Sequence, residues 1–521
     1  MRLLEKLLLI AVLPIIFWSC TETITDNLIG NNAPDTFIFL KPDSTISQQS
    51  SRLSVHWWGD DPDGLVVGYL YKWDGLDNSW HFTTKNDSVF NLPIGTIDTG
   101  FVFKIASVDN AGNGIYDTEL LWNGINIGPE PFIDQDGNGS YTAGEKFTDL
   151  GNIDPTPSEL KFPIKNSAPE IKWSQLSTLP ERSFPVITVA WDVEDLDGLQ
   201  TVTEILLAVN DTAKAVSLAG NVRLVTLRAN NFDSDNALAD ILVDGSESKI
   251  ADAKLSGLKL NSENIIYVQA KDIAGAKSGF IRLPDTSSSW YVAKPKGKLL
   301  LVDDFFSSDA PNDKKVTDFY NSAFSSLSGG ALNGKYDVLD LNKSKLPYQN
   351  ITFYQTLKLF KYVYWFAGSR PSFDLASLTT NPFLAGGGKI AFSFTFEDAS
   401  EVFPFGLNDL QLFLPVDSLG QKKSLSFLFP GAVAKAETGK DYPQLTTAST
   451  IGSARTFYPN QDAAEKIYSV TSTQLNGNIG LMNKEHSLFF IGLPLHQCNG
   501  GQANVNTLLQ KIFFQDFGLT L

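Results

Sequence analysis

The chain has 521 residues, of which 43% are hydrophobic and 12% aromatic, so we expect several packed domains and not a chain that is disordered throughout. Lys and Arg number 41 against 58 Asp and Glu, which gives a formal net charge of −17. Because phosphate groups bind where the local potential is positive, this balance argues against a nucleic-acid partner. Two cysteines and four scattered histidines exclude a disulfide framework and a zinc motif with closely spaced ligands.

Residues 1–20 have the form of a targeting segment. A short basic start is followed by an apolar run at residues 7–18, which is shorter than the ~20 residues that cross a bilayer, so it indicates a signal peptide. The run ends in Phe17-Trp-Ser-Cys20, which resembles bacterial lipoprotein signals in the looser form found in Bacteroidota-like bacteria. The resemblance implies that Cys20 is lipidated and anchors the protein in a membrane of the cell envelope, the outer membrane being expected. An ordinary secretory peptide or an uncleaved signal anchor is the alternative.

The chain contains an internal repeat. Residues 53–64 and 187–198 share an apolar alternation, a tryptophan and an acidic turn that ends in glycine. Residues 101–112 and 265–275 share an alternation that ends in Ala-Gly. We therefore expect two copies of one structural unit.

Alternation of period two between turns predicts antiparallel strands. After a polar tether at residues 21–32, the two units predict consecutive β-sandwiches at residues 33–127 and 167–293. They resemble fibronectin type III or immunoglobulin-like modules of bacterial surface proteins. This resemblance implies a fold and no particular function, because such sandwiches carry unrelated activities.

Aromatic residues of the first unit allow two interpretations. The strand alternation places about every second one in the core, and adjacent tryptophans must face opposite sides. The aromatic rings could instead stack against sugars, as in a carbohydrate-binding protein. The residues concerned are Trp57, Trp58, Tyr69, Tyr71, Trp73 and Trp80.

The most specific motif lies in residues 128–166, which we expect to link the two modules. Residues 134–145 have the ligand order of an EF-hand calcium loop, with oxygen donors at alternate positions and a glycine where the chain must turn sharply. The predicted ligands are Asp134, Asp136, Asn138, the backbone carbonyl of Ser140, Thr142 and Glu145.

The segments on either side of this loop are too short and too rich in turns to form the paired helices of an EF-hand. The loop resembles the isolated calcium loops of extracellular bacterial proteins, including dockerin-like sequences, although the second copy that a dockerin needs is missing. We expect a structural calcium ion that stiffens the linker. A metal-free acidic turn is the alternative.

Residues 296–521 change to short apolar runs that alternate with helix-compatible stretches. This alternation predicts an α/β domain with a doubly wound parallel sheet. An insertion at residues 408–480, rich in Pro, Gly, Ser and Thr, interrupts the pattern, and we expect it to cover the strand ends. The apolar runs lie at residues 299–302, 336–341, 362–367, 389–394 and 486–493, and helix-compatible stretches include residues 314–327 and 505–517.

Five segments in or beside these runs have characteristic residues. They are Leu299-Leu-Leu-Val-Asp-Asp304, Tyr336-Asp-Val-Leu-Asp340, Tyr364-Trp-Phe-Ala-Gly368, Gly386-Gly-Gly-Lys-Ile390 and Gly492-Leu-Pro-Leu-His496. Their order resembles the flavodoxin-like fold of class I glutamine amidotransferase-like domains, in the divergent form of secreted bacterial proteins. The resemblance implies a cysteine nucleophile on a glycine-flanked turn after the fourth strand. Residues 390–397 contain neither, and only Ser393 and Thr395 stand there as nominal substitutes. The domain is therefore expected to be a degenerate member without amidotransferase chemistry.

Four residues remain as weak catalytic candidates. Asp303 and Asp304 end the first run, at the edge where open α/β sheets bind ligands, and they could hold a metal or a proton or simply cap the next loop or helix. His496 lies where the family often has its histidine. It could act as a base beside Cys498, or the two could be a packed pair.

We expect a non-catalytic cell-envelope lipoprotein with a binding or structural role, for which a protein or a glycan is the possible ligand. The alternative is a secreted hydrolase that acts on glycan, peptide or cell-wall substrates through Asp303, Asp304, His496 or Cys498. A third possibility is a carbohydrate-binding protein that uses the sandwich modules. Convergence of Asp303, Asp304 and His496 in an open cavity would favour the hydrolase.

Overall fold

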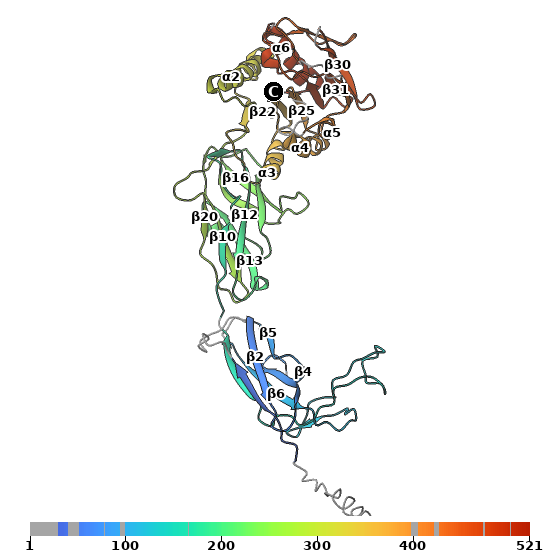
Figure 1. Ribbon diagram of the computed structural model, residues 1–521. Helices are drawn as coiled ribbons and strands as arrows, with labels where there is room; N and C mark the ends of the chain where they lie inside the picture. The colour runs from blue at the N-terminus through green and yellow to red at the C-terminus, as the bar shows by residue number, and fades with distance from the viewer. Residues whose placement is uncertain are drawn as a thin grey trace, which may run out of the picture. The chain divides into compact units, whose positions relative to one another are not determined.

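A computed structural model describes residues 30–39, 52–77, 79–93, 99–164, 166–396, 405–420, 427–472, 475–500 and 502–521. Cys20 and the rest of the predicted signal peptide lie outside these residues. The chain divides into two compact units, Met1–Ser167 with Leu196–Gly198 and Ala168–Asp195 with Leu199–Leu521. Figure 1 shows their strands and helices. None of the described helices is long and apolar enough to cross a membrane.

The first unit is built from two antiparallel sheets, with the orders β1-β2-β5 and β4-β3-β6-β9. The strands are β1 (Asp35–Phe39), β2 (Arg52–Asp60), β3 (Val66–Asp74), β4 (His81–Thr83), β5 (Asp87–Asn91), β6 (Thr99–Asp109) and β9 (Ser158–Ile164). Val55 and Trp57 from one sheet meet Phe103 and Ile105 from the other in one core, and none of the four is more than 2% exposed. The prediction of a β-rich first module is therefore confirmed.

Trp57 and Trp58 face opposite sides of β2, as the alternation predicts. Trp57 is 2% exposed, whereas Trp58 is 40% exposed and its ring stacks on that of Phe37, with centroids 4.7 Å apart. The other aromatic residues of the group are buried or half-buried: Tyr69, Tyr71, Trp73 and Trp80. Core packing thus accounts for most of the residues that a sugar-binding interpretation would use.

Between β6 and β9 the chain makes a long excursion, residues 110–157, which carries the predicted calcium loop (Figure 1). A short hairpin, β7 (Leu121–Trp122) and β8 (Ile125–Asn126), lies in its first half. The Asp109 carboxylate holds the two ends of the excursion together by accepting the N–H groups of Ala111 and Asn152, each at 2.9 Å. Because β9 pairs with β6, the predicted calcium loop belongs to the first unit and is not part of a free linker.

The internal repeat has a structural counterpart where each module begins. The Asp63 carboxylate, in the acidic turn after β2, accepts the backbone N–H of Asn32 at 3.1 Å. The corresponding Asp197 accepts the backbone N–H of Ser167 at 2.7 Å. Asn32 and Ser167 each begin an Xaa-Ala-Pro segment. The acidic turns therefore fix the path by which the chain enters each module.

The first part of the second unit, which we call the second module, contains two larger antiparallel sheets around one core. Their orders are β10-β12-β15-β16-β17 and β14-β13-β19-β20, and a small third sheet has the order β11-β21-β18. Trp191 of β12, the counterpart of Trp57, is 1% exposed in this core. The strands are β10 (Glu170–Trp173), β11 (Arg182–Ser183), β12 (Val186–Glu194), β13 (Val202–Val209), β14 (Val216–Ala219), β15 (Leu224–Ala229), β16 (Asn236–Val243), β17 (Leu255–Lys259), β18 (Ser262–Glu263), β19 (Ile266–Asp272), β20 (Ile281–Leu283) and β21 (Tyr291–Val292).

Residues 296–521, which we call the head, are organised around one nine-stranded mixed sheet with the order β23-β22-β24-β25-β32-β31-β30-β27-β28. The first five strands of this order run parallel, and each of the remaining four runs antiparallel to its neighbour. The strands are β22 (Leu299–Asp304), β23 (Tyr336–Asp340), β24 (Tyr362–Ala367), β25 (Lys389–Ser393), β27 (Val433–Ala436), β28 (Leu445–Thr446), β30 (Ala464–Thr471), β31 (Asn476–Asn483) and β32 (Leu488–Ile491), beside a separate pair formed by β26 (Val416–Leu419) and β29 (Phe457–Pro459).

The prediction of an α/β doubly wound parallel-sheet domain is wrong. The described residues hold 32 strands and five α-helices, and the head's own sheet is mixed. Most of the antiparallel strands come from residues 408–480, which the sequence predicts as an insertion that covers the strand ends. These strands are short, and the Pro, Gly, Ser and Thr residues around them hide the alternation of apolar and polar residues. The sequence pattern therefore did not predict this part of the sheet.

The helices of the head pack on both faces of the parallel strands. Val316 and Tyr320 of α2 share a buried cluster with Leu299 and Leu301 of β22, whereas Phe353 of α3 packs with the even-numbered side chains of the same strand. The helices are α2 (Ala310–Ser326), α3 (Gln349–Leu357), α4 (Phe373–Ala385), α5 (Leu407–Gln411) and α6 (Gln502–Gln510), which continues into a π-helical turn at Lys511–Asp516. Odd and even residues of β22 thus face different helices.

The second module and the head share a packed joint. Phe184 of the module belongs to the head's buried cluster, and its ring lies 5.2 Å from that of Phe360. Glu247 of the module accepts hydrogen bonds from Lys358 of the head at 2.5 Å through both carboxylate oxygens, and from Arg228 at 2.6 Å. Apolar packing and a shared ion pair therefore join the two parts into one compact unit.

Candidate functional site

The predicted calcium loop brings three carboxylates together. Oxygen atoms of Asp134, Asp136 and Glu145 lie within 4.8 Å of one another. Asp134 and Asp136 are exposed, whereas Glu145 is only 8% exposed. Like charges at this separation repel one another, and a cation between them would remove that cost.

Backbone N–H groups orient the first ligand of the loop. Asp134 accepts the N–H of Gly137 at 2.7 Å through Oδ1 and that of Gly139 at 2.8 Å through Oδ2. Both glycines have positive φ, 73° and 76°, which a side chain would strain. The bond from Gly139, with that from Gly137, lowers the pKa of Asp134 below its usual range, so this carboxylate stays ionised in mild acid.

Glu145 closes the loop from its other end. Its Oε1 accepts the N–H of Gln135 at 2.7 Å, and its Oε2 accepts the N–H of Thr142 at 2.8 Å. The chain segments outside the loop bond to each other as a ladder, with the N–H of Ile133 donating to the carbonyl of Lys146 at 2.8 Å. The loop is therefore clamped at its base without flanking helices.

An aromatic cluster supports this clamp. The rings of Tyr116 and Tyr141 stack with centroids 3.8 Å apart, and Phe132 and Phe147 meet both of them edge to face. Phe132 and Phe147 are also paired across the ladder at the loop's base. The ligand loop thus rests on a small packed core of its own.

The residues present fit a calcium ion. Asn138 donates its amide N–H to Asp136 at 2.9 Å, and the Thr142 hydroxyl donates to Asp136 at 3.0 Å, so these side chains join the three carboxylates in one cluster. The backbone N–H of Ser140 donates to Asn138 Oδ1 at 2.7 Å, whereas the role of the Ser140 carbonyl as a ligand stays a prediction. Hard oxygen donors from carboxylates, amide and hydroxyl groups are the ligands that calcium prefers.

In the head, Asp303 and Asp304 do not share a site. Asp303 Oδ2 accepts the Thr317 hydroxyl of α2 at 2.6 Å, and its Oδ1 accepts the N–H of Phe305 at 3.2 Å. Burial raises the pKa of Asp303 to about 6, and the nearby Asp340 carboxylate adds to this effect. Asp303 therefore ties the end of β22 to α2 and orients the residue that follows.

Asp304 points to the other face of the sheet. Its Oδ2 accepts the indole N–H of Trp365 at 3.0 Å and the backbone N–H of Ser372 at 2.6 Å, and its Oδ1 accepts the Ser372 hydroxyl at 2.7 Å. Burial raises its pKa to about 6. Ser372 is the residue that precedes α4. Asp304 is thus an anchor for a helix start, the structural alternative that the sequence left open.

His496 and Cys498 are close in sequence but serve as packed groups. The ring of His496 lies edge-on to Phe305 and Tyr320, at 5.4 and 5.7 Å, and its Nδ1 is 3.2 Å from the Tyr320 hydroxyl. Burial lowers the pKa of His496 to about 4, so the ring is neutral at physiological pH. Cys498 is 1% exposed, and burial raises its pKa to about 12. Such a thiol is not a nucleophile.

The nominal substitutes for a nucleophile are also almost fully buried, although Thr395 reaches the lining of a pocket at the ends of the parallel strands. Ser393 is completely buried, donates its hydroxyl to the carbonyl of Leu493 at 2.9 Å and accepts the N–H of Leu495 at 3.1 Å. Thr395 is 3% exposed. Its N–H donates to the carbonyl of Gly368 at 3.2 Å. Both residues connect neighbouring strand ends.

A cleft opens where the parallel strands end at their carboxyl termini, and we call it the carboxyl-end cleft. It consists of two adjoining pockets of about 240 and 390 Å³ that share Phe305, His496 and Gln497. Gly452 and Ser453 from the predicted insertion line the first pocket. Ala448 and Ser449, also from the insertion, line the second. Among the four catalytic candidates, His496 alone reaches the described lining.

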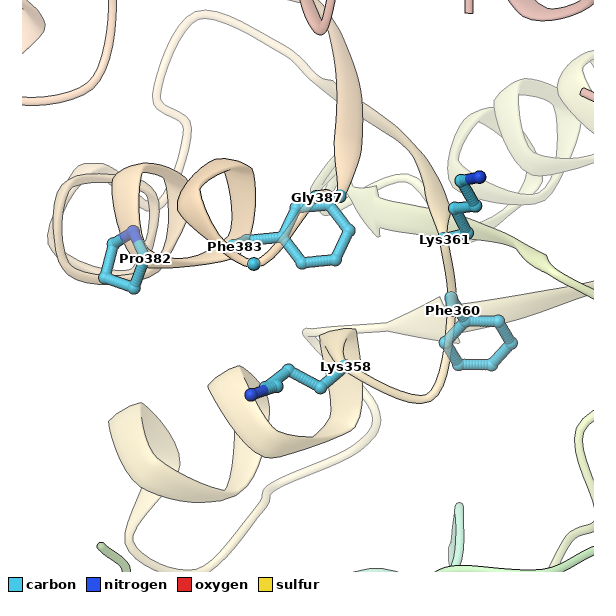
Figure 2. A pocket seen from close by; sticks show the side chains of 8 residues that line it. Lys358, Phe360, Lys361, Pro382, Phe383 and Gly387 are labelled. Carbon is cyan, nitrogen blue, oxygen red and sulfur yellow. The ribbon is translucent and has the colours of Figure 1, made fainter. Parts of the chain in front are cut away.

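A separate pocket, outside the carboxyl-end cleft, lies at the opposite ends of the parallel strands (Figure 2). It has a volume of about 380 Å³ and is lined by Lys358, Lys361, Phe383 and the glycines that precede β25. Lys358 is already bound to Glu247. The helices α3 and α4 both end here, and helix carboxyl ends carry partial negative charge. This pocket is therefore a poor site for an anion.

Sequence reasoning missed most of the residues that line the carboxyl-end cleft. Phe305 follows β22, Gly368 follows β24 and Pro494 follows β32, so a search of the residues after each predicted strand would have found them. Lys315 and Phe319 lie on helix α2 and carry no such signal.

No protein-family model matches the chain, and no curated protein matches it. Among solved structures it is similar to the fibronectin(III)-like modules of CbhA from Clostridium thermocellum, with 11% sequence identity and a TM-score of 0.15, over 50% of this chain and 94% of that one. It is also similar to immunoglobulin domains 1–5 of Sidekick-1, with 9% identity and a TM-score of 0.10, over 53% of this chain and 83% of that one. At these TM-scores neither similarity carries an argument, and the antiparallel sheets themselves are what establish the β-rich modules.

Proposed function

We propose that the protein is a non-catalytic lipoprotein of the cell envelope, anchored through Cys20, whose β-rich modules carry a ligand-binding head. The observation that carries the non-catalytic part is the separation of the four candidate residues. Asp303 and Asp304 hold different helices, and Cys498 is sealed in the core with a raised pKa. General acid–base or nucleophilic chemistry needs such groups side by side in a cavity.

The anchor rests on the sequence of residues 1–20 alone. Lipidation is tested by growing cells with an alkyne-tagged palmitate and comparing the wild type with Cys20→Ala. The wild type should carry the label and sediment with membranes, whereas Cys20→Ala should be unlabelled. An equally labelled variant would reject the anchor.

Catalysis is tested on the same protein with glycan, peptide and cell-wall substrates. We expect that the wild type shows no hydrolysis that is lost in the variants Asp303→Asn, His496→Ala or Cys498→Ala. Circular dichroism would establish that each variant is folded. An activity abolished by one of these substitutions in a folded variant would favour the hydrolase instead.

In this proposal calcium has a structural role in the first unit. It would bind at the cluster around Asp134, Asp136 and Glu145 and replace repulsion between the carboxylates by attraction. The excursion of residues 110–157 has little regular structure of its own. A bound ion would therefore stiffen the excursion, and through it the spacer part of the protein.

A further inference from the structure

We infer that the carboxyl-end cleft binds a neutral saccharide. This inference rests on the proposed function, because it names the ligand class of the binding head. The first argument is the position of the cleft. Residues that follow β22, β24, β25 and β32 all contribute to its first pocket, so four strand ends converge on one concave surface. The two pockets together reach the size range of ligand sites, roughly 300–1,000 Å³.

The charge of the lining selects for a neutral ligand. None of the described residues that line the two pockets is acidic, although the whole chain has a net charge of −17. Lys315 is the single cation among them. His496 is neutral because burial lowers its pKa, and Lys315 adds to that effect. A strongly cationic ligand would find no partner here, and a multiply charged anion would find only one.

The polar groups of the lining suit hydroxyl groups. Asn312, Gln497 and Asn499 offer amides, Ser453 offers a hydroxyl, and His496 offers a neutral imidazole. Each amide and the hydroxyl can both donate and accept a hydrogen bond, and the imidazole has Nε2 left to do one or the other, because its Nδ1 lies against Tyr320. A sugar hydroxyl also donates and accepts hydrogen bonds, so it can pair with these groups without leaving a buried charge.

Aromatic side chains supply the apolar part of the surface. Phe305 and Phe306 line the first pocket, and Phe305 and Phe319 line the second. Phe306 is 72% exposed, so its ring is accessible to a ligand in the cleft. The C–H face of a pyranose ring packs on such rings, while its hydroxyl groups reach the polar lining.

The walls of the cleft are held in place. The N–H of Ala448, from the insertion, donates to the carbonyl of Gln497 at 2.8 Å. The Asn342 amide donates to the carbonyl of Phe305 at 3.0 Å. Tyr320 holds His496 through both its backbone N–H and its ring, each at 3.2 Å. A pre-formed site loses little entropy when a ligand binds.

The experiment uses the full chain with Cys20→Ala, which is purified without detergent. An array of neutral oligosaccharides, together with sialylated and uronic-acid oligosaccharides, identifies the best ligand, and calorimetry then measures its affinity. Phe306→Ala and Gln497→Ala should each weaken binding of a neutral oligosaccharide by roughly three- to ten-fold. Phe429→Ala, at an exposed phenylalanine outside the cleft lining, is the matched control and should leave the affinity unchanged.

Three outcomes would overturn the inference. They are the absence of binding to every neutral saccharide, preferred binding of the acidic ones, and a loss of affinity with Trp58→Ala in the first unit but not with Phe306→Ala. The absence of binding to every neutral saccharide would not contradict the proposed lipid anchor or the proposed non-catalytic head. Cleavage of a saccharide whose binding needs Phe306 would support the saccharide site and reject the non-catalytic function.

Discussion

Asp303 and Asp304 are consecutive residues of β22, yet their carboxylates serve opposite faces of the sheet. Asp303 accepts the Thr317 hydroxyl from α2, and Asp304 accepts the N–H and the hydroxyl of Ser372 before α4. Because side chains alternate along a strand, two adjacent acids cannot both face one pocket. The pair therefore fixes two helices to one strand end.

Asp304→Asn should change how stability depends on pH. The folded state raises the pKa of Asp304 to about 6, so between roughly pH 4 and 6 the folded protein binds more protons than the unfolded chain, and stability falls as pH rises through this window. Asparagine resembles the protonated acid and removes this term. Relative to the wild type, the variant should gain roughly 2–3 kcal/mol of unfolding free energy between pH 4 and pH 7 in urea titrations. A relative loss over that range would mean that the ionised form is the stabilised one.

Asp304→Ala should instead lower stability at both pH values. The indole of Trp365 and the N–H and hydroxyl of Ser372 would lose their acceptor inside the protein. An unsatisfied buried donor costs roughly 1–3 kcal/mol, so we expect a total loss of about 3 kcal/mol or more. The same urea titrations measure it, and a variant as stable as Asp304→Asn would show that water replaces the carboxylate.

Calcium should bind the first unit through its acidic loop. Asp134→Asn and Glu145→Gln should each weaken calcium binding by roughly ten-fold or more, and together they should abolish the rise in melting temperature that calcium causes. Because hydrogen bonds hold the pKa of Asp134 below its usual range, this ligand should keep its charge to a more acidic pH than an ordinary aspartate does. Calorimetry and differential scanning fluorimetry check these effects. Glu119→Gln, at an exposed acid outside the cluster, should behave like the wild type.

Cys498 should be chemically silent in the native protein. Its thiol is buried and its pKa is raised to about 12, so iodoacetamide at pH 8 should not label the folded chain with Cys20→Ala. Denaturant should expose the thiol, and labelling read by mass spectrometry would then follow unfolding. Fast labelling without denaturant would mean that Cys498 is accessible in the folded protein, and Cys498 would again be a candidate nucleophile.

Glu247→Gln should weaken the joint between the second module and the head. Burial raises the pKa of Glu247, but the hydrogen bonds from Lys358 and Arg228 outweigh it and hold the pKa below the usual range. The stabilisation is therefore present at neutral pH and is lost as pH falls through the folded pKa. We expect a loss of about 1 kcal/mol at pH 7, with a positive coupling to Lys358→Met in a double-mutant cycle. Glu181→Gln, at another exposed acid of the module, should cost nothing measurable.

Local patterns in the sequence predicted local structure well. The run at residues 362–367 is a strand with those same bounds, and the tryptophans that mark the repeat, Trp57 and Trp191, are both core residues. The acidic loop needed only the order of side chains within twelve residues, from Asp134 to Glu145, and the structure brings its carboxylates together. These features depend on neighbours in sequence.

Features that depend on distant pairing were not predicted. Strand β9 lies in the expected linker, and only its pairing with β6 shows that it belongs to the first module. The antiparallel half of the head's sheet was missed for the same reason, since short strands such as Val433–Ala436 gain their stability from neighbours and not from their own pattern. The cleft likewise joins Phe305 to Gln497 and Ser453, which no spacing rule connects.

The burial of Cys498 has a further consequence if the protein lies in the cell envelope, as we propose. The chain has two cysteines and two methionines, and the two that lie within the described residues, Cys498 and Met482, are at most 1% exposed. Peroxide and other oxidants react with sulfur that they can reach. The folded head should therefore keep its structure through oxidative bursts that would inactivate a protein with accessible thiols or thioethers.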